Sequence, residues 1–142
     1  MTIYKTRRAA ESYGQAIGIL LLDAKTPFIP GDVANASTYA YPVIFKTIEG
    51  LTTPVCLNGA PEFNAKLAEG AKELEAAGVR GISSDCGFML QFQDAVREAV
   101  KVPVAMSSLL QIPMIAQTLD KSRSIGVITA DSTNLTPDFL KR

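Results

Sequence analysis

Apolar runs of strand length alternate with stretches of helical periodicity along this chain. Ile17–Leu22 is a continuous apolar run, which is typical of a strand covered on both faces in a parallel sheet. The pattern predicts further strands at residues 53–57, 81–85, 102–106 and 124–129, and helices at 37–49, 60–77, 88–100, 108–119 and 136–140. Such alternation is typical of βαβ units. We therefore expect an α/β fold, a parallel-sheet, three-layer α/β/α domain of flavodoxin-like type.

Residues 17–23 and 125–131 hint at an internal duplication. Both segments begin with Ile-Gly, continue with apolar or β-branched residues and end with Asp. Any two parallel strands can share this much, so chance similarity stands beside duplication as an interpretation. If residue 125 does begin a second copy, the chain has three parts: an N-terminal extension at 1–16, an α/β domain at 17–123, and the opening of a truncated second domain at 124–142.

The balance of charge narrows the function classes. The chain has 14 Lys and Arg and 14 Asp and Glu residues, so it lacks the net positive charge of a typical nucleic-acid-binding protein. Its longest apolar run is far shorter than the ~20 residues of a membrane span, and no signal peptide is expected. The two cysteines have no CxxC spacing, which disfavours a disulfide framework and a zinc site. We expect a cytoplasmic protein with neither nucleic acid nor membrane as a partner.

The absence of histidine restricts the chemistry further. It excludes Ser-His-Asp and Cys-His nucleophilic sites, imidazole proton shuttles and metals held by histidine. Acid–base chemistry at neutral pH must then use Cys, Asp, Glu, Lys or Tyr with a shifted pKa. No metal site is expected.

Cys86 is the strongest candidate for such chemistry, because ligands of parallel sheets bind where strands lead into helices. It follows the predicted strand at 81–85 and precedes Gly87, at the start of a predicted helix, where backbone N–H groups stabilise a thiolate. The neighbouring Asp85 acts against this, since a negative charge raises the pKa of a thiol. Free cysteines are also commonly small buried residues, so a core role for Cys86 stays open. Cys56, within an apolar segment, is expected in the core.

Two polar segments have both a structural and a functional interpretation. Residues 30–38 either start a helix, with Asp32, Asn35 or Ser37 as its cap, or donate side-chain and backbone groups to an anion. The serines at 107–108 are expected mainly to cap the helix that follows them.

Residues 83–89 (Ser-Ser-Asp-Cys-Gly-Phe-Met) and 107–111 (Ser-Ser-Leu-Leu-Gln) carry a resemblance to a known family. Together with the segments 17–23, 30–35 and 125–129, they resemble the cofactor-independent aspartate/glutamate racemase superfamily over essentially the whole chain. That superfamily also contains hydantoin racemases, maleate isomerases and arylmalonate decarboxylases. The resemblance therefore does not fix the substrate.

The resemblance implies two similar α/β domains related by a pseudo-twofold axis, with the active site between them. One cysteine from each domain flanks the α-carbon of the substrate. A thiolate takes the proton from one face and the opposite thiol returns one to the other face, with no pyridoxal phosphate, no metal and no other cofactor. Cys86 matches the cysteine of the first domain, whereas the second would lie beyond residue 142 and Cys56 cannot replace it.

The resemblance also implies substrate-binding residues, at strand ends where members of the family hold the carboxylate and amine of the substrate. These expected residues are Asp23, Asn35, Ser84, Asp85, Gly87 and Thr129. Asp85 stands where a small residue is expected in the family, which bears on the activation of the thiolate.

The function predicted on this basis is a racemase or isomerase of a small carboxylate, such as an acidic amino acid, with its site incomplete in this chain. One alternative is single-cysteine chemistry, in which Cys86 adds covalently to an unsaturated diacid as in maleate isomerases. The other is a non-catalytic domain that binds a small molecule or assembles with a partner, including a homo-oligomer, through apolar surface near residues 125–140.

Overall fold

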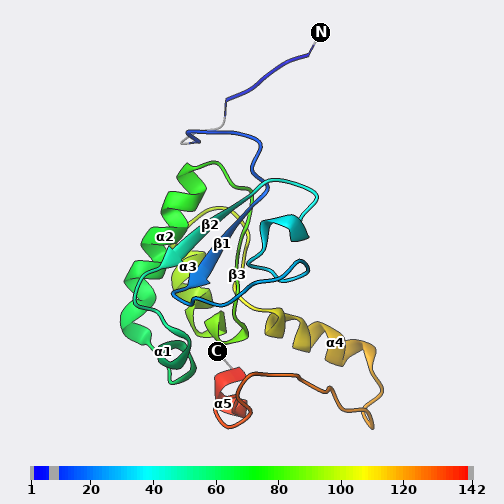
Figure 1. Cartoon of the computed structure of the whole chain (residues 1–142). Helices are drawn as coiled ribbons and strands as arrows, with labels where there is room; N and C mark the ends of the chain where they lie inside the picture. Colours follow the sequence, from blue (N-terminus) through cyan, green and yellow to red (C-terminus); the bar gives the residue numbers. More distant parts are fainter. Residues whose placement is uncertain (1, 7–9, 141–142) are drawn as a thin grey trace.

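Four parallel strands form the centre of the molecule (Figure 1). The computed structural model describes residues 2–6 and 10–140. The strands are β1 (Ile17–Leu22), β2 (Val43–Ile48), β3 (Ile82–Ser84) and β4 (Val104–Ala105), in the spatial order β2-β1-β3-β4. Every pairing is parallel, so all strands end at the same edge of the sheet. This confirms the predicted α/β fold class.

Helices connect and follow the strands. They are α1 (Thr53–Leu57), α2 (Asn64–Ala76), α3 (Gln93–Ala99), α4 (Ile112–Thr118) and α5 (Pro137–Leu140), with the 3-10 helices η1 (Ala36–Thr38), η2 (Pro61–Phe63), η3 (Gly87–Phe92) and η4 (Ser108–Gln111). The helices predicted at 60–77, 88–100, 108–119 and 136–140 are confirmed, as are shorter forms of the strands predicted at 81–85 and 102–106. Within the described part of the chain, no helix has both the length and the hydrophobicity needed to cross a membrane.

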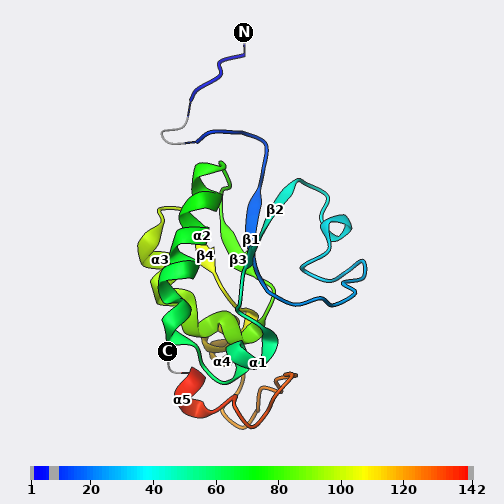
Figure 2. The same ribbon diagram turned by 60° about the vertical axis from the view of Figure 1, so that its left-hand side comes forward.

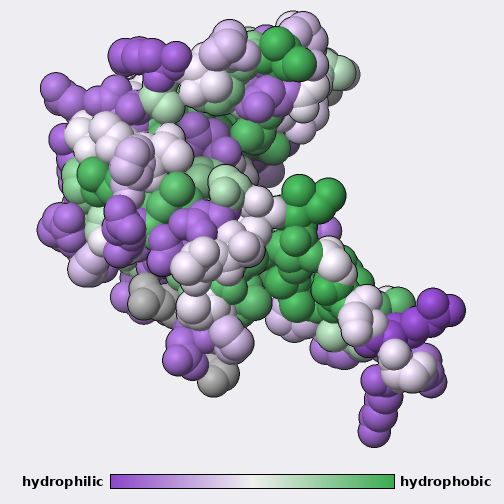
Figure 3. All heavy atoms as spheres, turned by 60° about the horizontal axis from the view of Figure 1, so that its bottom comes forward, coloured by the Kyte–Doolittle hydropathy of each residue, from purple (hydrophilic) through white to green (hydrophobic). Residues whose placement is uncertain are grey.

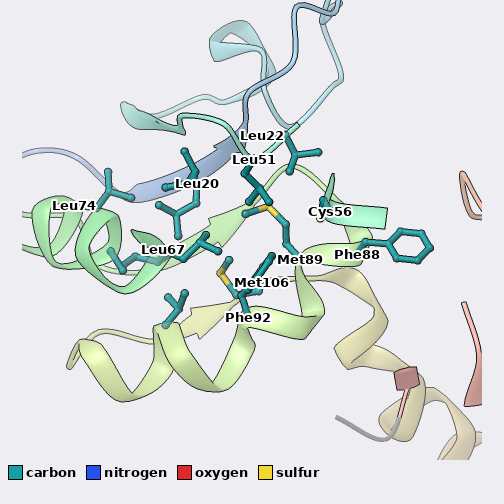
Figure 4. Packing of buried hydrophobic residues seen from close by; sticks show 14 of the residues in the cluster. Leu20, Leu22, Leu51, Cys56, Leu67, Leu74, Phe88, Met89, Phe92 and Met106 are labelled. Atoms are coloured by element: carbon teal, nitrogen blue, oxygen red, sulfur yellow. The ribbon is translucent and has the colours of Figure 1, made fainter. Parts of the chain in front are cut away.

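The hydrophobic core lies between the sheet and the two helices α2 and α3, which cover one of its faces (Figures 2 and 4). Leu20 of β1 and Leu67 and Leu74 of α2 are buried there. Gly18 allows the close approach of helix and strand, because a Cβ atom on it would stand 2.9 Å from Cδ1 and 3.1 Å from Cβ of Leu74. Helix α2 therefore packs directly on the backbone of β1.

Two elements near the middle of the chain differ from their prediction. The helix expected at 37–49 is wrong, because Pro42 disfavours a helix and Val43–Ile48, rich in β-branched residues, pairs with β1 as a strand. The strand expected at 53–57 is instead the helix α1, whose first turn tolerates Pro54. An apolar run this short does not by itself distinguish a strand from a helix.

The strand expected at 124–129 is also wrong. The described residues between α4 and α5 contain no strand, and this segment and α4 project from the sheet, where no neighbouring strand offers hydrogen bonds (Figure 1). Met114 and Ile128 expose much of their side chains, and hydrophobic residues gather on this projecting arm (Figure 3). The chain then returns to η3, where the rings of Phe139 and Phe88 lie 5.2 Å apart between centroids.

Gly18→Ala tests the packing of α2 on β1. The added methyl group would meet Leu74, so we expect the free energy of unfolding to fall by about 1–3 kcal/mol. Gly126→Ala is the matched control, because a Cβ atom at Gly126 would have no neighbour within 4 Å. Urea denaturation of both variants measures the difference, and equal stabilities would contradict the packing described.

Candidate active site

A cavity of about 370 Å³ opens at the edge of the sheet where the strands end. Its walls come from the ends of β3 and β4, the segments after them, and the loop between β1 and β2. The lining residues are Val33, Ser83, Ser84, Asp85, Cys86, Gly87, Ala105, Ser107, Ser108 and Gln111. This is the edge at which ligands of open parallel sheets bind.

The sequence-predicted site residues that follow β3 meet in this cavity. Ser84, Asp85, Cys86 and Gly87 all line it. Thr129 lines a second cavity of about 180 Å³, which shares Cys86 and Gly87 with the first. Cys86 therefore lines both cavities, and most of the other expected site residues line one or both of them.

Asp23 and Asn35 do not line either cavity. The carboxylate of Asp23 accepts a hydrogen bond of 3.1 Å from the backbone N–H of Gly50 and pairs with Lys25 at 3.3 Å. The side chain of Asn35 accepts from the backbone N–H of Ser37 at 2.9 Å and caps η1. Asn35 therefore caps a helix as expected, but this helix is the short 3-10 helix η1, because the longer helix expected at 37–49 does not form.

The serines of β3 hold this strand to its neighbour. The Ser83 hydroxyl donates to the carbonyl of Ala105 at 2.9 Å, and the buried Ser84 hydroxyl donates to the carbonyl of Met106. Ser107 caps η4 as expected, since its Oγ accepts from the N–H of Leu109 at 3.1 Å. Ser107, Ser108 and Gln111 line the cavity as well but are not among the residues expected in the site. The motif at 107–111, which follows a predicted strand, is the signal that could have indicated them.

The thiol of Cys86 carries the most reactive chemistry in the cavity. Cys86 lies half-buried in extended backbone immediately before η3. A hydrogen bond from the thiol of Cys56 lowers the pKa of Cys86 to about 7, and the backbone N–H groups of Phe88 and Met89 add to this effect. Burial and the charge of Asp85 oppose it. The expected influence of Asp85 is therefore present, but the hydrogen bonds outweigh it.

Cys56 is the partner of this thiol. It is fully buried, as expected of a core residue, and its thiol is hydrogen-bonded to that of Cys86. Its hydrogen bond to Cys86 raises the pKa of Cys56, as does its burial. The side-chain amide of Gln91 donates to the carbonyl of Cys56 at 2.9 Å and accepts from the N–H of Ala60 at 3.0 Å, which fixes α1 against η3.

Asp85 brings a carboxylate into the same cavity. The backbone N–H of Leu22 donates to both of its oxygens, at 3.1 and 3.2 Å. Burial raises the pKa of Asp85 to about 6, and the charge of Asp32 contributes to the rise. Among the described residues, none that lines the cavity is Lys or Arg, and no group of three or more acidic or cysteine side chains is arranged to hold a metal ion.

Comparison with curated proteins finds relatives that share one name. The chain is 34% identical to dimethylsulfoniopropionate lyase 7 of Emiliania huxleyi over 131 residues, which are 89% of this chain and 38% of that protein. It is 34% identical over 125 residues to the dimethylsulfoniopropionate lyase of Durusdinium sp. clade D, covering 86% of this chain and 42% of the relative. Dimethylsulfoniopropionate lyase 5 of Emiliania huxleyi is 36% identical over 128 residues, which are 87% of this chain and 25% of that protein. The chain thus spans less than half the length of these relatives.

No protein-family model and no solved structure matches the chain. The relatives at 30–36% identity are named lyases, which overturns the predicted membership of the racemase superfamily. The predicted racemase activity, the amino-acid substrate and the two-thiol inversion are wrong for the same reason, and neither alternative function has better support. The relatives are named as enzymes, which agrees with the prediction that this chain is an enzyme but not with the predicted racemase type. This chain is similar over most of its length to dimethylsulfoniopropionate lyases.

Proposed function

We propose that this chain carries the base of a lyase site, in which the Cys86 thiolate removes a proton from dimethylsulfoniopropionate. The observation that carries the proposal is the placement of Cys86 in a cavity at the strand ends, beside the thiol of Cys56. The names of the relatives supply the substrate class, and a cavity of about 370 Å³ has room for a molecule as small as dimethylsulfoniopropionate.

The chemistry needs one base and no redox step. Dimethylsulfoniopropionate has a carboxylate, two CH₂ carbons and a dimethylsulfonium group. When the thiolate takes a proton from the carbon beside the carboxylate, the C–H electron pair forms a C=C bond. The C–S bond breaks and its electron pair leaves with sulfur as neutral dimethyl sulfide, so acrylate remains. The Cys86 thiol then returns its proton to solvent.

The electrostatics of Cys86 match this role. A general base works best when its pKa lies near the working pH, because it is then both deprotonated and basic enough to accept a proton. The pKa of Cys86, about 7, meets this condition in a chain without histidine. The hydrogen bond from Cys56 and the N–H groups of Phe88 and Met89 supply the stabilisation that imidazole provides in many other thiol sites.

A longer protein would enclose the site further. The relatives extend well beyond the matched region, and the hydrophobic side chains exposed on the projecting arm, Met114 and Ile128 among them, support packing against another unit. The predicted boundaries at 17–123 and 124–142, the three-layer pseudo-twofold arrangement, the homo-oligomer and the cytoplasmic location all stay predictions.

Replacement of Cys86 tests the proposed base. With Cys86→Ser, we expect kcat/KM for dimethyl sulfide release to fall by about 10²–10⁴-fold, because a hydroxyl is a far weaker base than a thiolate. Gas chromatography of the headspace above dimethylsulfoniopropionate measures the product. Cys56→Ser is the comparison variant: it removes the other thiol but keeps a hydrogen-bond donor to Cys86, so its loss of activity should be much smaller. Equal release by the Cys86→Ser variant and the original chain would contradict the proposal, as would no release by either.

The pH dependence tests how the thiolate is stabilised. Because the deprotonated thiol is the active form, kcat/KM should rise with pH through about 7 and then level. Cys56→Ala removes the donor that lowers the pKa of Cys86, so the rise should move to higher pH, whereas Cys56→Ser should restore part of the shift. Asp85, the other titratable group facing this thiol, raises its pKa and so acts in the opposite direction. An unchanged profile in Cys56→Ala would show that the two thiols do not interact.

A further inference from the structure

We propose that Asp85 is the counter-ion that selects a permanently cationic onium group in the substrate, such as a sulfonium. The inference rests on the proposed function in so far as the substrate there is a sulfonium carboxylate. It assigns to Asp85 a role in specificity that is separate from proton removal by Cys86.

The surroundings of Asp85 leave its charge without a cationic partner in the cavity. The carboxylate is half-buried and receives the N–H of Leu22 on both oxygens, and no Lys or Arg of the described chain lines the cavity. A buried carboxylate normally requires a cation or several hydrogen bonds to offset its lost hydration. A bound cation would fill that requirement.

A second carboxylate strengthens the negative potential. Asp32, in the loop between β1 and β2, is close enough for its charge to raise the pKa of Asp85. Asp85 is nevertheless mostly ionised at neutral pH, since its pKa is about 6. Asp85 lines the partly enclosed cavity, and the charge of Asp32 outside this lining adds to the negative potential there. Such a potential concentrates cations, because the low dielectric of the walls focuses the field.

An onium group fits this environment better than an ammonium group with N–H bonds. A dimethylsulfonium has no N–H or O–H, so charge and van der Waals contact are its means of recognition. Val33 lines the same cavity and offers methyl groups to the methyl groups of such a ligand. The combination of Asp85 with Val33 supplies both kinds of contact.

The two ends of the cavity differ in chemistry, as a zwitterion requires. Asp85 is held on the side of β1 by Leu22, whereas Ser108 and Gln111 follow β4, and β3 lies between these strands. Hydroxyl and amide groups on the β4 side suit the carboxylate of the substrate. Cys86, at the end of β3, then faces the carbons between the two charged ends.

A pair of ligands that differ only in charge tests the inference. 3-Trimethylammoniopropionate carries a fixed cation and a poor leaving group, and 4,4-dimethylpentanoate has the same shape with carbon in place of nitrogen. Chemical-shift titrations of the ¹⁵N-labelled chain give Kd for each ligand. We expect the cation to bind at least about tenfold more tightly than its neutral counterpart, as one ion pair near a protein surface can provide.

Asp85→Asn should abolish this preference, because the amide keeps the acceptor for the Leu22 N–H but loses the charge. Asp120→Asn is the matched control, since Asp120 is an exposed loop residue that lines neither cavity and its loss changes net charge equally. Should Asp85→Asn fail to fold, the original chain at pH 5 replaces it. At pH 5 most of Asp85 is protonated, so the preference for the cation should fall. Asp32 and Cys86 are the other titratable groups that face Asp85.

The result separates this inference from the proposed lyase activity. Equal affinities for the two ligands, a preference that survives in Asp85→Asn, or no binding of either ligand would each overturn the role of Asp85. If the original chain releases dimethyl sulfide but shows no preference, the lyase proposal stands and this inference falls. If the preference depends on Asp85 but no dimethyl sulfide forms, the onium site stands and the lyase proposal falls.

Discussion

The parallel pairing of β1, β3 and β4 is the constraint on which the candidate site depends. Because parallel strands end at one edge, Asp85, Cys86 and Ser108 come together although two different strands position them. The pairing also brings the N–H of Leu22, at the end of β1, within hydrogen-bond distance of Asp85. Packing of α2 and α3 on the sheet then holds this edge in place from one side.

The two thiols show how a chain without histidine can prepare a base at neutral pH. Cys56 is fully buried and Cys86 is not, so a negative charge is more stable on Cys86. The N–H groups of Phe88 and Met89 favour the same choice. Gln91 secures the helix that carries Cys56, which makes the hydrogen bond between the thiols a consequence of how α1 packs on η3.

The sequence was sufficient to place Cys86 at a strand end, because strand-to-helix turns follow from hydrophobic patterning alone. It was not sufficient to predict that Cys56 lies beside Cys86, since an apolar run of five residues suits a strand as well as the helix α1 that forms. Asp23 and Asn35 were expected in the site from their positions, but local hydrogen bonds turn both side chains to structural roles. The racemase resemblance rested on short motifs around Cys86, and such motifs locate a thiol without specifying which bond breaks.

The ionisation of Cys86 decides whether this residue can act as a base at neutral pH, and the rate of alkylation by iodoacetamide at each cysteine as a function of pH measures it. Mass spectrometry of the digested chain separates the two sites. We expect Cys86 to reach half of its maximal rate near pH 7, while the buried Cys56 stays unreactive over the same range. A rate at Cys86 that rises only at the pH of an ordinary thiol would contradict it.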